Sequence, residues 1–284
     1  MILFDSHAHI NAENYSEAER TALKDRIEAS TVAYVVDIGF DIPSSRIAMR
    51  NAMERSWCFA AVGVHPHDAK TLKDDDLNEL RSMLDDPSVV ALGEIGLDFH
   101  YDHSPRDVQR EVFRKQLRVA LDAGVPVTIH DRESAGETIE ILKDEGAFSN
   151  DRRALFPKNP VTGIADARIL LHCFSGSAEQ AIEYIDLGCT ISIAGPVTYK
   201  NNKKTVLVVQ EIPVAHMLIE TDSPYLTPEP LRGKPNESPN VEYVCRKIAE
   251  LRGVSPEEIA DVTTNNALRF YNLSSNPERS EGSF

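Results

Sequence analysis

The chain has 284 residues, of which 42% are hydrophobic and 26% charged, a length and composition ordinary for one large soluble domain. Its 30 basic and 45 acidic residues give a net charge of −15, which argues against general affinity for nucleic-acid phosphates unless positive charge is placed locally. No apolar run approaches the roughly 18 residues of a membrane span and no signal peptide is recognisable, so we expect a cytoplasmic protein without membrane contact or an obligate protein partner.

Short apolar runs recur along the chain and predict buried parallel strands. Each run is nearly continuous in apolar residues and is bounded by glycine, proline or polar residues, as is typical of strands covered on both faces. The eight runs are ILF (2–4), AYVVDIGF (33–40), CFAAVGV (58–64), VVALGEIG (89–96), VPVTIH (125–130), RILLHCF (168–174), CTISIAG (189–195) and HMLIETD (216–222).

Amphipathic segments lie between these runs and predict helices. In the clearest one, residues 105–124, Pro105 stands near the start and Gly124 closes the segment. Eight strands that alternate with helices predict an α/β fold of the (β/α)8, or TIM-barrel, type as a single domain over residues 1–273. A doubly wound open sheet is the alternative, because the number of strands does not prove closure. The other predicted helices cover 16–30, 44–56, 177–188 and 241–253.

Two segments depart from this alternation. Residues 147–167 contain Pro157 and Pro160 and have no sustained helical period, so we expect an inserted surface loop. The tail 274–284 is rich in serine and glutamate and is expected to be disordered. The four cysteines form no CxxC pair, which argues against disulfides and a structural zinc site.

Ligand-type residues recur at the ends of the predicted strands. His7 and His9 lie two positions apart after the first run, so their side chains point the same way, toward the mouth of the barrel. Active sites in barrels of this kind lie at the carboxyl ends of the strands. Six candidates therefore gather at one end, namely His7, His9, Glu94, His130, His172 and Asp222.

These four imidazoles and two carboxylates suit a divalent ion such as Zn²⁺, Mn²⁺ or Mg²⁺. Six protein ligands exceed what one catalytic ion uses, since such an ion keeps an open position, so we expect two ions bridged by Glu94. A paired-ion site points to hydrolysis, with Asp222 as the proton acceptor beside a metal-activated water. Gly93 and Gly96 flank Glu94 and would allow a close approach of the backbone.

Two further residues near the predicted mouth are candidates for substrate binding. His65, in GVHPHD (63–68), ends the third run and either reaches the substrate or is a hydrogen-bonded loop histidine. Arg132 follows His130 by two positions and either binds an anionic group or pairs with Glu133.

Basic residues after the seventh and eighth runs could supply the missing positive charge. Lys203 and Lys204 follow the seventh run together with Lys200, and Arg232 and Lys234 follow the eighth. Loops at these two positions often bind phosphate in this fold. The alternative for any one lysine is a solvated helix start.

The sequence resembles the TatD family of metal-dependent hydrolases and deoxyribonucleases over residues 3–273. The motifs that carry the resemblance occur in the family's order and are FDSHAHIN (4–11), GVHPHD (63–68), GEIGLDF (93–99), the HDR of VTIHDRESAGE (127–137), LLHCFSGS (170–177) and ETDSPYLTP (220–228), with RGKPNESPN (232–240) after them.

The resemblance implies a barrel with one or two divalent ions that hydrolyses phosphodiesters in DNA, often as a 3′→5′ exonuclease on single strands. The family's ligand positions fall on the six candidate ligands above, and Asp222 also matches its catalytic acid. The segment 147–167 is longer than the family leads us to expect. Because it lies between His130 and His172, we expect it at the active-site face, where it would shape substrate entry or an oligomer contact.

Two other functions are compatible with the same residues. A metal-dependent ester or amide hydrolase, for example one that removes D-amino acids from tRNA, would use the same ions, although Glu94 stands where many amidohydrolases carry a carboxylated lysine. A metal-containing binding protein without turnover is the second, and Asp222 argues against it because a scaffold needs no proton acceptor. We therefore expect a deoxyribonuclease.

Overall fold

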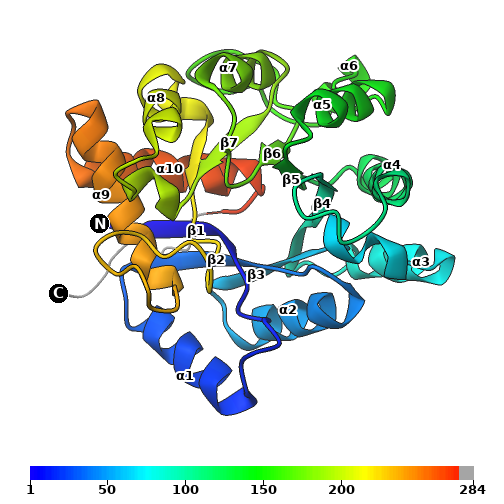
Figure 1. The fold of residues 1–284 in the computed structure, drawn as a ribbon, viewed down its shortest axis with the longest axis horizontal. Coiled ribbons are helices and arrows are strands. Elements are labelled where there is room, and N and C mark those ends of the chain that lie inside the picture. Colours follow the sequence, from blue (N-terminus) through cyan, green and yellow to red (C-terminus); the bar gives the residue numbers. More distant parts are fainter. Residues whose placement is uncertain (275–284) are drawn as a thin grey trace.

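The computed structural model describes residues 1–274, and at its centre eight parallel strands follow one another around a barrel (Figure 1). Each strand pairs with the next in the chain, and a parallel bridge between Ala8 and Ser223 closes the ring. The predicted (β/α)8 barrel is therefore confirmed and the open sheet excluded. The strands are β1 (Leu3–Ala8), β2 (Val32–Ile38), β3 (Cys58–Val62), β4 (Val89–Asp98), β5 (Val127–Arg132), β6 (Ile169–Leu171), β7 (Thr190–Ile193) and β8 (Met217–Ile219).

Helices form the outer layer around the strands (Figure 1). The five predicted helices are present, and α3, α5, α6, α8 and α10 add to them. None of the helices within residues 1–274 is long and apolar enough to cross a membrane. The helices are α1 (Glu17–Glu28), α2 (Ile42–Glu54), α3 (Asp74–Met83), α4 (Arg106–Ala123), α5 (Ala135–Asp144), α6 (Asn150–Ala154), α7 (Ala178–Asp186), α8 (Lys203–Glu211), α9 (Val241–Arg252) and α10 (Pro256–Phe270), with short 3-10 turns η1 (Pro66–Thr71), η2 (Gly195–Thr198), η3 (Val214–His216) and η4 (Ser238–Asn240).

Local sequence sets the ends of several helices. Ser16 and Glu19 form a reciprocal capping box that begins α1, because each side chain satisfies a backbone N–H that the helix leaves without a partner. Gly124 closes α4 with a positive φ of 69°, a conformation that glycine adopts without a steric penalty. Strands β1, β2 and β4 are buried along their whole length, as continuous apolar runs predict. All four cysteines are free.

The segment 147–167 differs from its prediction as an inserted surface loop at the active-site face. It contains α6, and Arg152 and Asn159 are buried in it. Arg152 donates to the carbonyl of Val125, which precedes β5, and Asn159 Nδ2 donates to the carbonyl of Ala215, which precedes β8. Both partners lie at the amino ends of strands, so the insertion covers the base of the barrel, opposite the mouth.

The carboxyl terminus of the described chain also covers this base. In α10, Thr264 Oγ1 donates to the carbonyl of Ile2 at 3.1 Å, and Asn266 Nδ2 donates to that of Met217 at 3.0 Å. Both carbonyls stand at the beginning of a strand, and α10 therefore seals the amino end while the mouth stays open. The predicted disorder of 274–284 falls, from residue 275 onward, outside the described residues.

Candidate metal centre

The six predicted ligands lie together at the mouth of the barrel. His7 belongs to β1, and His9 follows it. Glu94 and His130 were predicted at the ends of their strands, but they lie inside β4 and β5. A strand interior holds a side chain more rigidly than a strand end, because backbone pairing continues on both sides of the residue.

Asp222 reaches the centre through the closure of the barrel. Strand β8 ends at Ile219, earlier than predicted, and the chain then runs alongside β1. The N–H of Asp222 donates to the carbonyl of His7 at 2.9 Å, and the N–H of His9 donates to the carbonyl of Ser223 at 2.8 Å. Asp222 has φ of 56°, in the left-handed region that aspartate tolerates better than most residues.

One carboxylate oxygen of Glu94 faces three imidazoles. Glu94 Oε1 lies 2.7 Å from His130 Nδ1 and 2.7 Å from His172 Nε2. His65 Nε2 lies farther away, at 3.5 Å from the same oxygen. The structure thus places His65 beside the centre, while its other ring nitrogen is hydrogen-bonded within the loop, as the second of its two alternatives predicts.

The other oxygen of Glu94 faces the first strand. Glu94 Oε2 lies 3.3 Å from His7 Nε2 and 3.9 Å from His9 Nε2. Asp222 Oδ1 lies 3.7 Å from His7 Nε2 and 3.4 Å from His9 Nε2. Glu94 therefore stands between two sets of donor atoms and directs one oxygen to each.

The spacing of these donor atoms fits divalent ions. His7 Nε2 lies 3.3 Å from His9 Nε2, and His172 Nε2 lies 3.3 Å from His130 Nδ1. Ligands about 2.0–2.1 Å from a tetrahedral ion stand about 3.3–3.4 Å apart, so both separations match one edge of such a coordination shell. With histidine and carboxylate donors only, the two sets could hold Zn²⁺, Mn²⁺ or a similar ion.

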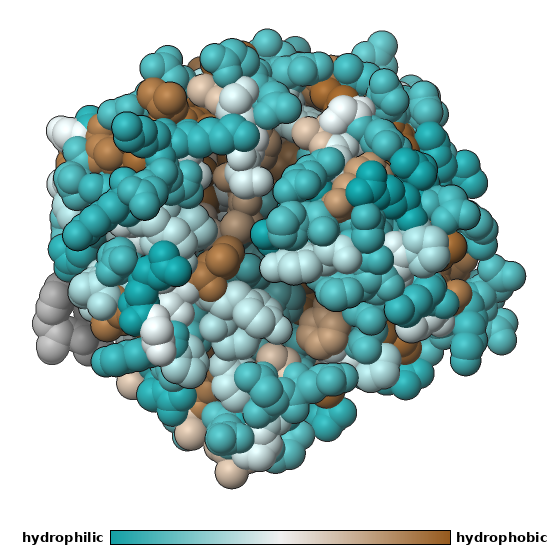
Figure 2. Space-filling view, in the orientation of Figure 1, coloured by the Kyte–Doolittle hydropathy of each residue, from teal (hydrophilic) through white to brown (hydrophobic). Residues whose placement is uncertain are grey.

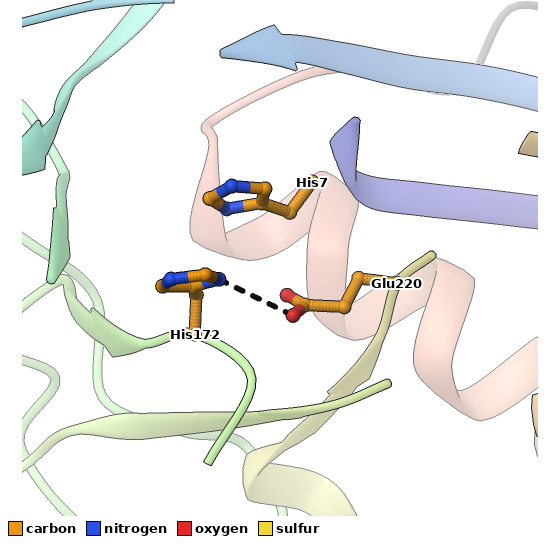
Figure 3. A group of neighbouring side chains, drawn as sticks. All are labelled: His7, His172 and Glu220. Atoms are coloured by element: carbon orange, nitrogen blue, oxygen red, sulfur yellow. Dashed lines mark hydrogen bonds and ion pairs between the residues drawn. The ribbon is translucent and has the colours of Figure 1, made fainter. Parts of the chain in front are cut away.

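Glu220 orients His172 and is not one of the predicted ligands (Figure 3). Its Oε1 lies 3.3 Å from His172 Nδ1 and accepts the N–H of Cys173 at 2.8 Å, while its Oε2 accepts the hydroxyl of Ser192 at 2.5 Å. The ring of His7 stacks on that of His172, with centroids 3.9 Å apart. Both oxygens of Glu220 are thus occupied, although His7, His172 and Glu220 are close enough to form a ligand group on distance alone.

Outer partners determine which ring nitrogen faces the centre. His9 Nδ1 lies 2.8 Å from the carbonyl of Ile38, which can only accept, so Nδ1 carries the proton and Nε2 offers its lone pair inward. Asp98 Oδ2 lies 3.2 Å from His130 Nε2 and in the same way leaves Nδ1 toward Glu94. Asp98 and Glu220 were not predicted from the sequence, although each stands an even number of positions from a predicted ligand and so faces the same side of an extended chain.

His65 has the opposite arrangement. Its Nδ1 accepts the backbone N–H of His67 at 3.0 Å, so the neutral ring carries its proton on Nε2, which points toward Glu94. Burial lowers the pKa of His65 to about 4 and keeps the ring neutral near pH 7. His65 is therefore a hydrogen-bond donor at the edge of the centre.

The carboxylates of the centre are ionised. Burial by itself would raise the pKa of Glu94, but His172, His65 and His7 hold it well below its usual range. Burial likewise opposes ionisation of Asp222, and its pKa is lowered chiefly by the neighbouring His9, whose Nε2 lies 3.4 Å from Asp222 Oδ1. Negative charge concentrated at buried oxygens is the environment that attracts a divalent cation.

Two glycines bring β4 against β5. A Cβ at Gly96, where φ is 142°, would lie 2.0 Å from the carbonyl oxygen of His130, and one at Gly93 would lie 2.7 Å from Thr128. The predicted close approach at both positions is confirmed. A larger residue at Gly96 would separate the strands that carry Glu94 and His130.

The two predicted substrate-binding arginines each lie over a tyrosine ring. Arg132 lies over the ring of Tyr101, 4.8 Å from its centroid, while Glu133 lies against His100 Nδ1 at 2.8 Å. Arg232 lies over Tyr199, 4.1 Å from the ring centroid.

The predicted basic patch is only partly gathered. Arg232 and Lys200 line a pocket of about 510 Å³ together with Tyr199. Lys203 and Lys204 are exposed in the first turn of α8 and do not line it. The space-filling view in Figure 2 shows a hollow near the centre of the molecule's visible face, with largely hydrophilic residues around it.

Residues 4–272 match a family model described as TatD related DNase. A Bacillus subtilis (strain 168) protein named uncharacterized metal-dependent hydrolase YabD is 43% identical over 96% of this chain and 100% of its own length. A Musicola paradisiaca (strain Ech703) protein named 3'-5' ssDNA/RNA exonuclease TatD is 31% identical over 95% of this chain and 98% of its own. The crystal structure of YJJV, a TATD homolog from Escherichia coli K12, superposes with a TM-score of 0.81 at 27% identity, covering 96% of this chain and 98% of the other.

Proposed function

The chain belongs to the TatD family of metal-dependent hydrolases, and from that premise we propose that it hydrolyses phosphodiester bonds of nucleic acid as a 3′→5′ exonuclease on single-stranded DNA. The observation that carries the proposal is the position of Glu94, whose two oxygens face separate donor sets. A pair of divalent ions on either side of one carboxylate is the arrangement used to clamp the attacking and leaving oxygens of a phosphodiester. The relative named as an exonuclease supports the substrate class.

We assign the ligands as two groups that share Glu94. His7, His9 and Asp222 form the first, and His130 with His172 the second. When bound, divalent ions supply Lewis acidity and a nucleophilic water of lowered pKa. The ligand side chains are held in place by the fold: four of the six are buried in β-strands or directly after them. The outer nitrogens of His9, His130 and His172 also lie within hydrogen-bond distance of fixed partners.

Asp222 acts as the proton acceptor, and His65 acts as a hydrogen-bond donor to the substrate. The lowered pKa of Asp222 leaves it ionised at neutral pH, and its side chain is 15% exposed, so it can accept the proton of the attacking water. The Nε2–H of His65 can donate to a phosphate oxygen, because its other nitrogen is occupied by the backbone. Arg132, Arg232 and Lys200 supply the positive charge at the mouth that the acidic chain lacks elsewhere.

The test is cleavage of 5′-labelled single-stranded DNA by the metal-loaded protein, with Glu94→Ala and Glu79→Ala compared with wild type. Glu79 is a carboxylate of outer helix α3 that pairs with Arg46. We expect metal-dependent shortening from the 3′ end that falls by several orders of magnitude in Glu94→Ala and is unaffected in Glu79→Ala.

Two results would contradict the proposal. Wild-type-like cleavage by Glu94→Ala would remove the shared carboxylate from the mechanism. A metal-loaded wild type that cleaves neither DNA nor RNA, but hydrolyses aminoacyl esters or amides, would keep the hydrolase and replace its substrate class.

A further inference from the structure

Two exposed tyrosines border the mouth on opposite sides of the metal centre. Tyr101 is 51% exposed and follows β4, and Tyr225 is 60% exposed and follows β8. In a closed barrel with the strand order β1 to β8, these two strands face each other across the axis. The centre, built on β1, β4, β5 and the chain after β6 and β8, lies between the two tyrosines.

Each tyrosine is joined to the centre through its backbone. The N–H of Tyr225 donates to the carbonyl of Asp222 at 2.8 Å, and Asn236 Nδ2 donates to the carbonyl of Tyr225 at 2.8 Å. The N–H of Tyr101 donates to Asp98 Oδ1 at 2.9 Å, and the other oxygen of Asp98 faces His130. Both rings therefore start from a backbone position that is fixed relative to the ligands.

Both tyrosines are more than half exposed, although Tyr101 already has two groups packed against its ring. Arg132 lies over Tyr101 and His103 lies parallel to it, with ring centroids 5.5 Å apart. Tyr225 stands edge to face with the ligand His9, with centroids 6.2 Å apart, which places it next to where the reacting bond would lie.

We propose, on the basis of the nuclease function proposed above, that Tyr225 and Tyr101 stack on two bases of one single-stranded segment and so position the scissile phosphodiester over the metal centre. Stacking on tyrosine suits this task because every base has a π face, so the contact forms with any nucleotide sequence. The guanidinium of Arg132 adds cation–π attraction and balances phosphate charge on the Tyr101 side. Paired bases have both faces covered by their neighbours in the duplex, so the same arrangement selects unpaired strands.

The experiment compares two oligonucleotides of equal length in the presence of Mg²⁺ or Mn²⁺. One carries bases throughout, and the other has abasic residues at its three 3′-terminal positions. Base–aromatic stacking predicts that wild type has a kcat/KM at least about tenfold higher for the normal strand, mainly through KM. In Tyr225→Ala and in Tyr101→Ala this ratio falls, and in the double variant it falls to about one.

Conservative and distant variants separate stacking from damage to the fold. Tyr225→Phe and Tyr101→Phe retain the ring and are expected to retain the ratio. Tyr243→Ala removes an exposed tyrosine from outer helix α9 and leaves the ratio at the wild-type value. Circular dichroism establishes that each variant is folded.

The outcomes distinguish this inference from the function on which it rests. If wild type cleaves both oligonucleotides equally well, or if the double variant keeps the full ratio, the stacking role is refuted while the nuclease stands. If wild type cleaves neither strand with any divalent ion, the nuclease function is refuted and the stacking role with it.

Discussion

Replacing Asp98 by asparagine tests how the outer partners control the metal centre. Asp98 is fully buried, and its Oδ1 accepts the N–H of His100 at 3.0 Å and that of Tyr101 at 2.9 Å. Its Oδ2 lies 2.8 Å from His67 Nε2 and 3.2 Å from His130 Nε2. An asparagine must keep its oxygen on the two backbone N–H groups, so its NH2 group turns toward the two histidines.

That exchange reverses the hydrogen bond to His130. An NH2 group can only donate, so His130 Nε2 must become the acceptor and its proton moves to Nδ1, the atom that faces Glu94. The protonated Nδ1 is no longer a ligand. Outer-partner substitutions of this kind typically weaken metal binding by about 10- to 100-fold, equivalent to about 1.4–2.7 kcal/mol.

Calorimetric titration of the metal-free protein with Mn²⁺ or Zn²⁺ measures the effect. We expect Asp98→Asn to weaken one of two binding events and to spare the other, because His7, His9 and Asp222 do not contact Asp98. Asp102→Asn, in the exposed pair with Arg106, is the matched control and binds both ions like wild type. If Asp98→Asn bound both ions with wild-type affinity, the assignment of His130 as a ligand held by Asp98 would be wrong.

Two further predictions concern stability. Removing divalent ions with a chelator should lower the melting temperature by about 5 °C for each site, if the free metal was at 100 times its dissociation constant, because such binding contributes about 2.7 kcal/mol. Differential scanning calorimetry measures this shift. An unchanged melting temperature would contradict a preformed metal site. Asn159→Ala should lower the free energy of unfolding by about 2 kcal/mol, since the buried carbonyl of Ala215 and the N–H groups of Val161 and Thr162 lose their partner. Urea unfolding measures that loss, and metal affinity should not change because the insertion lies at the base; a weakened metal site would place the insertion wrongly.

Sequence patterns predicted the barrel because its signals are local. Every one of the eight strands overlaps a short apolar run, since a buried parallel strand needs apolar residues on both faces. The helices α3, α5, α6, α8 and α10 were not predicted. For α3, the segment Asp74–Met83 is short and strongly charged, which weakens its periodic signal. For 147–167 the prolines indicated a loop, whereas burial of Arg152 and Asn159 depends on the barrel base beneath them.

The sequence by itself determined which side chains could form the centre. Histidines two positions apart on a strand, and carboxylates near the ends of other strands, must face one end of a parallel barrel because side chains alternate along each strand. Their role as ligands stays a proposal, but their position at one end follows from this alternation together with the parallel order of the strands.

Only the tertiary structure decided how these side chains are used. Asp222 meets His7 through the closure of the ring, across 215 positions of sequence (222 minus 7), and Glu220 and Asp98 select the facing nitrogens of His172 and His130. No local pattern encodes these relations, because each depends on which backbone and side-chain groups from distant strands stand within hydrogen-bond reach. The position of a proton on an imidazole, and with it the difference between a ligand and a donor such as His65, is therefore a property of the folded barrel.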